Sequence, residues 1–305
     1  MASRALLICG ATGKQGGAVI STLLKEKAGF EILAVTRDAN SASAQRLRSK
    51  APDTIKLVQG DLADPAALFK TAKGVATNPI WGVFSVQAVF GGSELDQGTA
   101  MIDASLAADV NFFVYTSVDR HGAASLDSPT NIPHFIHKHK IEQHLISATK
   151  SKPSSSMEWT ILRPVAFMEN LTDNFFGRAF VSAWRIAVKD KPLQLIAVSD
   201  IGVFGAKAFM APEHFKGKAV SLAGDEVTLE QAGRIFQART GKKLVGTYGL
   251  LTRAILAMVK DMGLMFRWFY DVGYAADVKE LKKTYPGLKD FGTWLETESD
   301  WATKK

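Results

Sequence analysis

Cysteine is almost absent from this sequence. Its 305 residues include a single cysteine, Cys9, which excludes an internal disulfide framework and a cysteine-rich metal site. The composition is compatible with a reducing compartment. Hydrophobic residues make up 47% of the chain and charged residues 22%, which is typical of a folded globular protein and excludes the collagen-like, low-complexity and disordered classes.

A long hydrophobic run is also missing. The most apolar stretch, 250–274, is interrupted by Arg253, Lys260, Asp261 and Arg267, whereas a membrane-spanning helix needs about 20 consecutive, mostly apolar residues. The apolar run before the first glycines is too short for the core of a signal peptide. We therefore expect no membrane segment and a cytoplasmic protein, with the nucleus as the alternative location.

The chain carries no long run of charge of one sign. Its 37 Lys and Arg residues against 30 Asp and Glu residues give a net charge of +7, but the basic residues cluster only in pairs, such as Lys242 with Lys243 and Lys282 with Lys283. Nucleic-acid patches are usually basic runs of about five to eight residues. A solvated basic surface is therefore the favoured interpretation, and nucleic-acid binding, which depends on net charge alone, is the weaker one.

What the sequence does contain is a regular alternation of two kinds of segment. Apolar or β-branched runs predict strands at 5–9, 31–36, 55–58, 81–86, 112–116 and 159–162. Between them, amphipathic or capped segments predict helices after the first glycines, at 41–50, after Asp64 and Pro65, at 94–108 and at 133–149. Repeated strand–helix–strand units form parallel sheets covered on both faces. The pattern predicts an α/β fold with a doubly wound parallel sheet of the Rossmann type.

Beyond Pro164 the alternation weakens, and a second, smaller and partly helical lobe is expected. We assign 1–165 to a dinucleotide-binding domain, to which 193–225 returns, and we assign 166–192 and 226–305 to the smaller lobe. Such a lobe would form one wall of a cleft over the carboxyl edge of the sheet.

Local signals predict several elements in this C-terminal part. A helix is expected at 170–180, and strands are expected at 193–198 and 219–223. Thr228 and Gln231 form a capping box that opens a helix ending at Gly241. Asn170 is expected either to cap the helix that follows it or to contact a substrate.

Aromatic and methionine side chains are concentrated in the smaller lobe. They are expected either to form its core or to line an apolar pocket, in which case the substrate would be a flat, apolar carbonyl, enone or quinone. The residues concerned are Phe167, Met168, Phe175, Phe176, Met265, Phe266, Trp268 and Phe269.

The strongest motif is a glycine-rich segment directly after the first expected strand. It reads GATGKQG, from Gly10 through Gly13 to Gly16. Between a strand and a helix, such glycines allow a tight turn, let the backbone approach a pyrophosphate and let helix and strand pack closely. The helix N-terminus adds N–H groups and the positive end of its dipole, and Lys14 adds a charge. The segment predicts a dinucleotide phosphate site.

The end of the second expected strand indicates which dinucleotide binds. An acidic residue there would bind the ribose 2′-hydroxyl of NAD, but this chain has Arg37, whose guanidinium suits the 2′-phosphate of NADP(H). Asp38 follows directly, so NAD stays the weaker alternative. After the third expected strand, Asp61 is placed either to accept a hydrogen bond from the adenine amino group or to hold a turn.

Several segments together resemble the NmrA-like proteins, which are atypical members of the short-chain dehydrogenase/reductase superfamily. They are GATGKQG, VTRD, QGDL, HFIHKHKIEQHL and WTILRPVAFMENL, and the C-terminal MFRWFYDVGYAADVKELKKTYPGLKDFGTWL is similar to fungal NmrA-like chains. The resemblance covers nearly the whole chain and implies an NADP(H)-binding extended Rossmann fold with a small C-terminal lobe. It also implies phosphate-loop roles for Gly10, Thr12, Gly13, Lys14, Gln15 and Gly16.

The resemblance implies further cofactor contacts and two functions. Arg37 is expected to contact the 2′-phosphate, Asp61 and Leu62 to lie on the adenine side, and Lys138 to reach the nicotinamide ribose. Some relatives reduce metabolites, whereas others, including HSCARG-like redox sensors, bind the nucleotide and then a regulatory protein. We predict an NADPH-dependent oxidoreductase acting on an apolar carbonyl, enone or quinone, with the non-catalytic redox sensor as the alternative.

The catalytic residues of the superfamily are only partly present. Typical members have a Tyr four residues before the Lys, where a nearby ammonium lowers its pKa so that it acts as the acid. Here His134 holds that position relative to Lys138, on the same face of the expected helix. Either His134 or Lys138 donates a proton, with Ser117 in the serine position, or the site is vestigial and only holds ribose and phosphate. No metal site is expected, because His137 and His139 have no carboxylates at ligand spacing.

Overall fold

The computed structural model of the chain describes residues 4–87, 94–151 and 157–302. The chain divides into two compact units, each assembled from three stretches. The first unit comprises Met1–Ser117, His137–Leu162 and Ile201–Val220, and the second comprises Val118–Ile136, Arg163–Asp200 and Ser221–Lys305. Within the range expected to return to the first unit, 201–220 does so, whereas 193–200 and 221–225 belong to the second.

The first unit is built on a seven-stranded parallel sheet with the order β3-β2-β1-β4-β5-β6-β9. The strands are β1 Arg4–Ile8, β2 Phe30–Thr36, β3 Ile55–Gln59, β4 Ile80–Ser85, β5 Phe112–Thr116, β6 Glu158–Pro164 and β9 Lys218–Leu222. The six strands expected from the first half of the chain are confirmed, with ends shifted by at most two residues. The strand expected at 219–223 is β9, which extends the same sheet beside β6.

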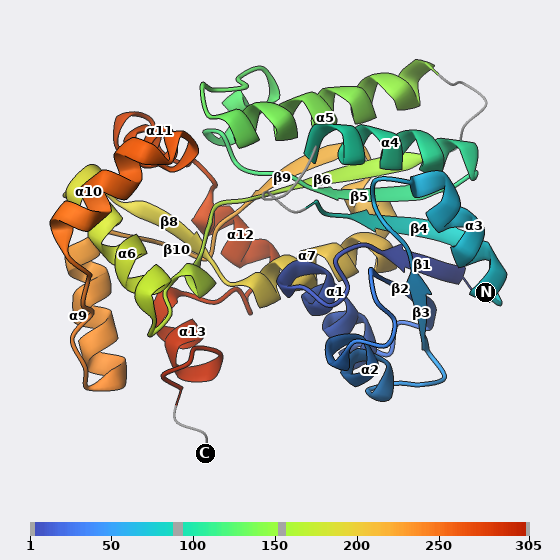
Figure 1. The fold of residues 1–305 in the computed structure, drawn as a ribbon, viewed down its shortest axis with the longest axis horizontal. Helices are drawn as coiled ribbons and strands as arrows, with labels where there is room; N and C mark the ends of the chain where they lie inside the picture. The colour runs from blue at the N-terminus through green and yellow to red at the C-terminus, as the bar shows by residue number, and fades with distance from the viewer. Residues whose placement is uncertain (1–3, 88–93, 152–156, 303–305) are drawn as a thin grey trace. The chain divides into compact units, whose positions relative to one another are not determined.

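Helices cover both faces of this sheet, as the doubly wound fold requires. Figure 1 shows α4 and α5 on one face and α1, α2 and α7 on the other, and α3 packs against α4. Their bounds are α1 Lys14–Lys25, α2 Ala42–Ser49, α3 Pro65–Val75, α4 Glu94–Ala107, α5 Pro133–Ser151 and α7 Val198–Met210, with a short α8 at Pro212–Phe215. The expected cap before α3 is confirmed, because the Asp64 side chain accepts from the backbone of Ala67 and Pro65 follows it.

Helix α7 was not expected from the sequence, and the strand expected at 193–198 is shorter than predicted. That strand, β8, ends at Ile196, and Val198 already begins α7. The helix is apolar on most sides, with Ile201, Phe204 and Phe209 buried. Gly202 lies against α1 so closely that a Cβ there would be 2.5 Å from the carbonyl carbon of Ala18. A helix buried on this scale has no polar stripe, so periodicity does not reveal it.

The second unit contains a three-stranded sheet in the order β10-β8-β7. Its strands are β7 Ala166–Phe167, β8 Leu193–Ile196 and β10 Asp225–Val227, with β8 antiparallel to β10 and parallel to β7. The helices of this unit are α6 Phe175–Ala183, α9 Leu229–Thr240, α10 Gly249–Met258, α11 Lys260–Asp271, α12 Val278–Thr284 and α13 Phe291–Thr297. Short helical turns lie at Gly122–Leu126, Met168–Asn170 and Trp184–Val188.

Two predicted helix boundaries in this unit have different outcomes. The capping box of Thr228 and Gln231 and the C-cap at Gly241 are confirmed at the two ends of α9. The helix expected from residue 170 instead begins at Phe175, where Asn174 accepts from the first-turn N–H groups of Phe176 and Gly177. Asn170 ends a short turn of 3₁₀ helix and is exposed, so the expectation that it caps this helix is wrong.

Most of the aromatic and methionine residues singled out in the smaller lobe form its core. Met168, Phe266, Trp268 and Phe269 are at most 7% exposed and belong to one hydrophobic cluster, against which Met265 packs. For these side chains the core interpretation holds. Phe175 and Phe176, by contrast, are 46% and 79% exposed at the start of α6, and Phe167 is half-buried.

Two further properties concern the described residues only. No helix among them combines the length and the hydrophobicity that crossing a membrane would require. Their His, Cys, Asp and Glu side chains form no group of three or more that could hold a metal ion.

Candidate nucleotide site

The glycine turn lies where β1 ends. Gly10 has a φ of +60°, and its carbonyl accepts a hydrogen bond from the Gly13 backbone at 2.9 Å. A Cβ on Gly16 would lie 2.5 Å from the carbonyl oxygens of Cys9 and Gly10. Glycine is therefore required at position 10 by the backbone conformation and at position 16 by the close approach of α1 to the turn.

Helix α1 presents its N-terminus at this turn. It begins at Lys14, its N-cap residue is Gly13, and no side chain caps its first turn. Thr12, Gly13 and Lys14 are exposed, and the first turn carries no acidic residue. The first N–H groups of a helix have no partner within it, and the helix dipole makes this end positive. The turn is therefore suited to hold an anion such as a pyrophosphate.

Gln15 connects the turn to β5. Its side-chain carbonyl accepts a hydrogen bond of 2.6 Å from the Thr116 hydroxyl, which fixes the orientation of the amide. The backbone carbonyl of Thr116 in turn accepts from Lys138 Nζ at 3.4 Å. Thr116 thus joins the glycine turn to Lys138. Thr116 was not among the residues expected at the site, although its place beside Ser117 at the end of an expected strand was a usable signal.

Arg37 and Asp38 follow β2 and differ in their hydrogen-bond partners. Arg37 is exposed, and no ion pair involves it in the described part of the chain. The Asp38 carboxylate accepts from the Asn40 backbone at 2.8 Å, and its own N–H donates to the Thr36 hydroxyl. Because Asp38 is engaged in its own turn, Arg37 is the charge presented at the end of β2, where a 2′-phosphate would be bound.

Asp61 and Leu62 lie after β3. Asp61 is exposed, and one of its carboxylate oxygens accepts from the Ala63 backbone at 2.9 Å. Leu62 is half-buried against the hydrophobic cluster of the first unit. The structure therefore gives Asp61 the role of holding a turn, and its contact with adenine stays a prediction.

Lys138 is buried beside a carboxylate. Its ammonium lies 3.0 Å from Oε1 of Glu94 in α4, and 5.8 Å from the centre of the Tyr115 ring. Lys138 is 7% exposed and Glu94 is 2% exposed. A buried ion pair of this kind fixes the position of the ammonium beside the carboxyl ends of the central strands. Glu94 was not among the residues expected at the site, and its only local signal is its place in the first turn of a helix.

Ser117 also contacts a carboxylate. Its hydroxyl donates to Oε1 of Glu142 in α5, and both residues are buried. Glu142 is four residues after Lys138, so α5 supplies both the cation near Thr116 and the acceptor for Ser117. A serine held in this way is oriented by the protein, and its hydroxyl proton points toward Glu142.

His134 lies in the part of α5 that belongs to the second unit. Its Nδ1 is 2.7 Å from Oδ2 of Asp261, at the start of α11, and its ring packs edge-on against Phe135. A carboxylate at Nδ1 fixes the orientation of the imidazole ring. The structure therefore places His134 with Asp261 in the second unit, and it places Ser117 and Lys138 with the glycine turn in the first.

The parallel sheet, the glycine turn after β1 and the arginine after β2 together define a Rossmann-type dinucleotide-binding protein. The sequence profile of the NmrA-like family matches residues 2–295. The chain therefore belongs to the NmrA-like family.

Relatives of known sequence are similar over most of their length. An NmrA-like family domain-containing protein of Dictyostelium discoideum is 24% identical over 309 residues, covering 96% of this chain and 100% of the relative. Quinone oxidoreductase 2 of Escherichia coli is 28% identical over 261 residues, covering 85% of this chain and 82% of the relative. Several fungal relatives are named NmrA-like family domain-containing oxidoreductases.

Solved structures share the fold. NmrA, a negative transcriptional regulator, in complex with NADP has a TM-score of 0.69 at 15% identity, with 98% of this chain and 95% of that one covered. The NADPH-dependent quinone oxidoreductase QOR2 of Escherichia coli, in complex with NADPH, has a TM-score of 0.67 at 24% identity, with 95% and 97% covered. One of these proteins is named as a transcriptional regulator and the other as an oxidoreductase.

Proposed function

We propose that this protein binds NADP(H) and uses NADPH to reduce an apolar carbonyl, enone or quinone. The observation that carries the proposal is that two features of an NADP(H) site occur together. The N-terminus of α1 has no side-chain cap, and Arg37 is exposed while Asp38 is engaged in its own turn. The names of the relatives support it, since they include a quinone oxidoreductase and several NmrA-like oxidoreductases.

Different residues of the first unit would bind different parts of the cofactor. The glycine turn and Lys14 would bind the pyrophosphate, Arg37 the 2′-phosphate, and Asp61 with Leu62 the adenine side. When bound, NADPH supplies a hydride to the substrate carbon. The substrate oxygen then takes up a proton, and the ammonium of Lys138 is positioned by Glu94 and Thr116 either to donate it or to hold the ribose.

His134 and Ser117 have more restricted roles in this proposal. His134 is held by Asp261 within the second unit, so its part as a proton donor stays a prediction. Ser117 is a positioning residue, because its hydroxyl donates to Glu142 and thereby orients both side chains at the end of β5.

The test is the loss of NADPH absorbance with purified protein and a panel of quinones, enones, aldehydes and polycyclic ketones. The control is the double variant Glu94→Gln with Lys138→Met, which removes the ammonium without leaving a buried carboxylate charge. Turnover by the wild type that is lost in a folded, NADPH-binding double variant supports a reductase that depends on Lys138. Turnover that persists in the double variant contradicts that role.

A non-catalytic NADP(H) sensor that binds a regulatory protein is the second candidate. The observation that favours it is that no Tyr stands four residues before Lys138, while Ser117 already donates to Glu142. A sensor needs different affinities of its two nucleotide states for the partner. Affinity capture in the presence of NADPH and of NADP+ should then give different partner profiles, and identical profiles would count against this function.

A further inference from the structure

Large apolar side chains are exposed together in one part of the second unit. In the described chain, six of the twelve exposed large apolar side chains lie between residues 245 and 259. They are Val245, Tyr248, Leu250, Leu251, Met258 and Val259, and we call them the α10 surface. Tyr248, Leu250 and Met258 are 83%, 85% and 81% exposed. Single exposed apolar residues are ordinary, but a contiguous group of this kind usually marks a binding surface.

Helix α10 is apolar on both sides, although protein covers only one of them. On the covered side, Thr252 is buried and its hydroxyl donates to the helix's own backbone at Tyr248, while α6 and α11 pack nearby. On the exposed side, Leu250, Ala254 and Met258 recur at a spacing of four residues and form one stripe. A helix that is apolar all round is expected to be buried all round, so the exposed stripe of α10 calls for a second apolar environment.

Positive charge surrounds this stripe. The segment 231–260 contains no Asp or Glu. Lys242 and Lys243 precede α10, Arg253 lies within it, and Lys260 follows it, and all four are exposed. Among the described residues no ion pair uses any of the four. The α10 surface is therefore an apolar strip with uncompensated cations at both ends.

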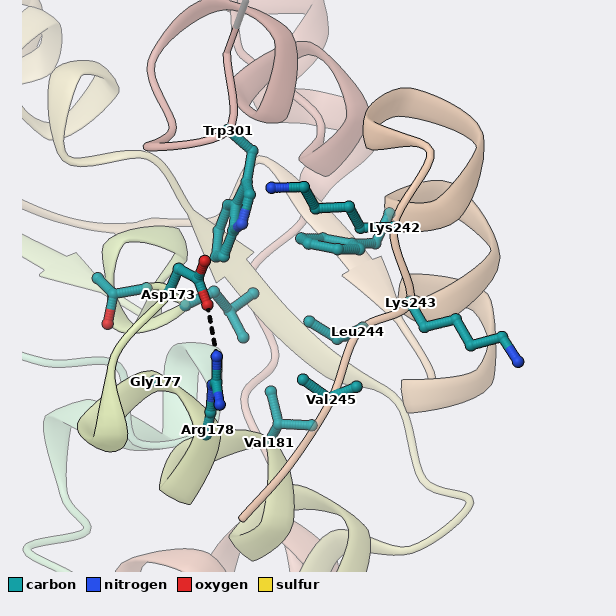
Figure 2. A pocket seen from close by; sticks show the side chains of 12 residues that line it. Asp173, Gly177, Arg178, Val181, Lys242, Lys243, Leu244, Val245 and Trp301 are labelled. Carbon is teal, nitrogen blue, oxygen red and sulfur yellow. Dashed lines mark hydrogen bonds and ion pairs between the residues drawn. The ribbon is translucent and has the colours of Figure 1, made fainter.

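A pocket at one end of the α10 surface shows which nearby cations are paired and which face solvent. It has a volume of about 190 Å³ and is lined by residues of α6, by Trp301 and by the segment 242–245. Figure 2 shows Arg178 and Asp173 facing each other there, and their ion pair is 3.0 Å long. The side chain of Lys243 extends away from the pocket (Figure 2). The charge of Arg178 is thus compensated inside the pocket, whereas that of Lys243 is presented to solvent.

We propose that the α10 surface docks onto an anionic lipid membrane. A helix that lies in the interface buries an apolar face among the acyl chains and keeps Lys and Arg at the level of anionic headgroups. The ten residues of α10 span about 15 Å, which suits a helix lying on a bilayer and is far too short to cross one. Long lysine side chains can reach headgroups while their stems stay apolar. The proposal does not depend on the reductase activity.

Charge argues against a second copy of this chain as the occupant. Two α10 surfaces packed face to face would bring eight uncompensated cations together, four from each copy, and like charges across an interface disfavour association. An acidic protein partner would match the charge. However, among the exposed side chains of 245–259 only Tyr248 and Arg253 are polar and could pair with such a partner, whereas acyl chains need no hydrogen-bond partner.

The test is flotation with vesicles at physiological ionic strength. The wild type should float with vesicles of phosphatidylcholine mixed with phosphatidylglycerol, and should bind pure phosphatidylcholine at least about tenfold more weakly. The double variant Leu250→Ser with Met258→Ser should weaken binding to the mixed vesicles at least about tenfold, since both side chains are exposed and their loss leaves the fold intact. Leu126→Ser, an exposed leucine elsewhere in the second unit, should bind like the wild type.

A charge pair provides a second matched comparison. Lys242→Glu with Lys243→Glu should weaken binding at least about tenfold. Lys282→Glu with Lys283→Glu, which changes the net charge by the same amount at the end of α12, should have a clearly smaller effect. Equal effects of the two pairs would mean that net charge alone attracts the protein to lipid and would overturn the proposal.

Insertion can be read directly with a single fluorescent label. Cys9 is fully buried and burial raises the pKa of its thiol to about 12, so an introduced surface cysteine is the reactive one. A polarity-sensitive dye on Met258→Cys should shift to the blue on addition of anionic vesicles, and the same dye on Leu126→Cys should not. Three outcomes would each overturn the proposal: failure to float, an unshifted dye at 258, and a dimer that depends on Leu250 without vesicle binding. An unshifted dye would point to a protein partner, and such a dimer would point to a second copy of the chain.

Discussion

The ammonium of Lys138 lies 3.0 Å from the carboxylate of Glu94, and both side chains are buried. The pair joins α5 to α4 in the first unit. Because Lys138 also donates to the Thr116 carbonyl, its position is fixed by two elements of the sheet unit as well as by its own helix. Lys138 is therefore a structural residue whatever it contributes to chemistry, and any substitution of it must be interpreted with that in mind.

The first prediction concerns this pair. Lys138→Met alone leaves the buried Glu94 carboxylate without its nearest cation and should lower the free energy of unfolding by about 3–5 kcal/mol. Adding Glu94→Gln should restore much of that loss, because two neutral side chains of similar size replace the charges. Urea unfolding of the wild type, both single variants and the double variant measures the coupling. Additive effects of the two substitutions would contradict a direct ion pair.

Arg37 provides the prediction on cofactor choice. Arg37→Asp should weaken NADPH binding by about 1–3 kcal/mol through the loss of a charge-assisted contact with the 2′-phosphate. NADH lacks this phosphate, so its binding should change much less. Calorimetric titration of the wild type and of Arg37→Asp with both nucleotides provides the comparison. Equal losses for NADPH and NADH would show that Arg37 does not contact the 2′-phosphate.

Two neighbouring glycines in α1 offer a matched test of the glycine turn. A Cβ on Gly16 would lie 2.5 Å from two backbone carbonyl oxygens, whereas a Cβ on Gly17 would meet only the Ala11 carbonyl, at 3.3 Å. Gly16→Ala should therefore cost about 1–3 kcal/mol of stability and should abolish tight nucleotide binding. Gly17→Ala should be close to neutral, because alanine favours the helix. Thermal unfolding and NADPH titration of both variants measure the difference, and similar behaviour of the two would contradict the packing account.

Glu169 should make the stability of the second unit depend on pH. Burial raises the pKa of its carboxyl above the ordinary 4.5, although hydrogen bonds from the Val198 backbone and the Trp294 indole oppose the shift. At a pH between 4.5 and the folded pKa, the folded state holds a proton that the unfolded chain has lost. The protonated carboxyl therefore contributes stability that is lost as pH rises through the folded pKa.

The variant Glu169→Gln removes that titration and keeps an acceptor for both donors. Its free energy of unfolding relative to the wild type should increase as the pH rises from about 4.5 and level off above the folded pKa. Urea unfolding followed by tryptophan fluorescence over this range is the measurement. A difference that stays constant with pH would show that Glu169 titrates normally.

The sequence predicted the fold of the first unit well, because each of its signals is local. Apolar runs mark the buried strands, and Gly10 and Gly16 are fixed by the backbone conformation and packing of a single turn. Helix α7 escaped prediction because it is apolar on most sides, so it carries no periodic stripe. The start of α6 was misplaced because Asn170 and Asn174 both fit a cap, and only the folded chain distinguishes them.

The glycine turn and the individual site residues were predicted, but the side chains that contact those residues from other helices were not. Lys138 was expected near the cofactor from the resemblance to the NmrA-like proteins, but Glu94 lies on another helix and no local pattern links the two. The same holds for His134 with Asp261, whose side chains meet across 127 residues of sequence. Contacts of this kind depend on tertiary packing, which a single sequence does not encode in its spacing.

The central claim is that the first unit selects NADP(H), and calorimetric titration of the wild-type protein with NADPH and NADH tests it most directly. The account predicts that NADPH binds at least about tenfold more tightly than NADH, because only NADPH brings a phosphate to Arg37. Equal affinities, or no binding of either nucleotide by the folded protein, would contradict it.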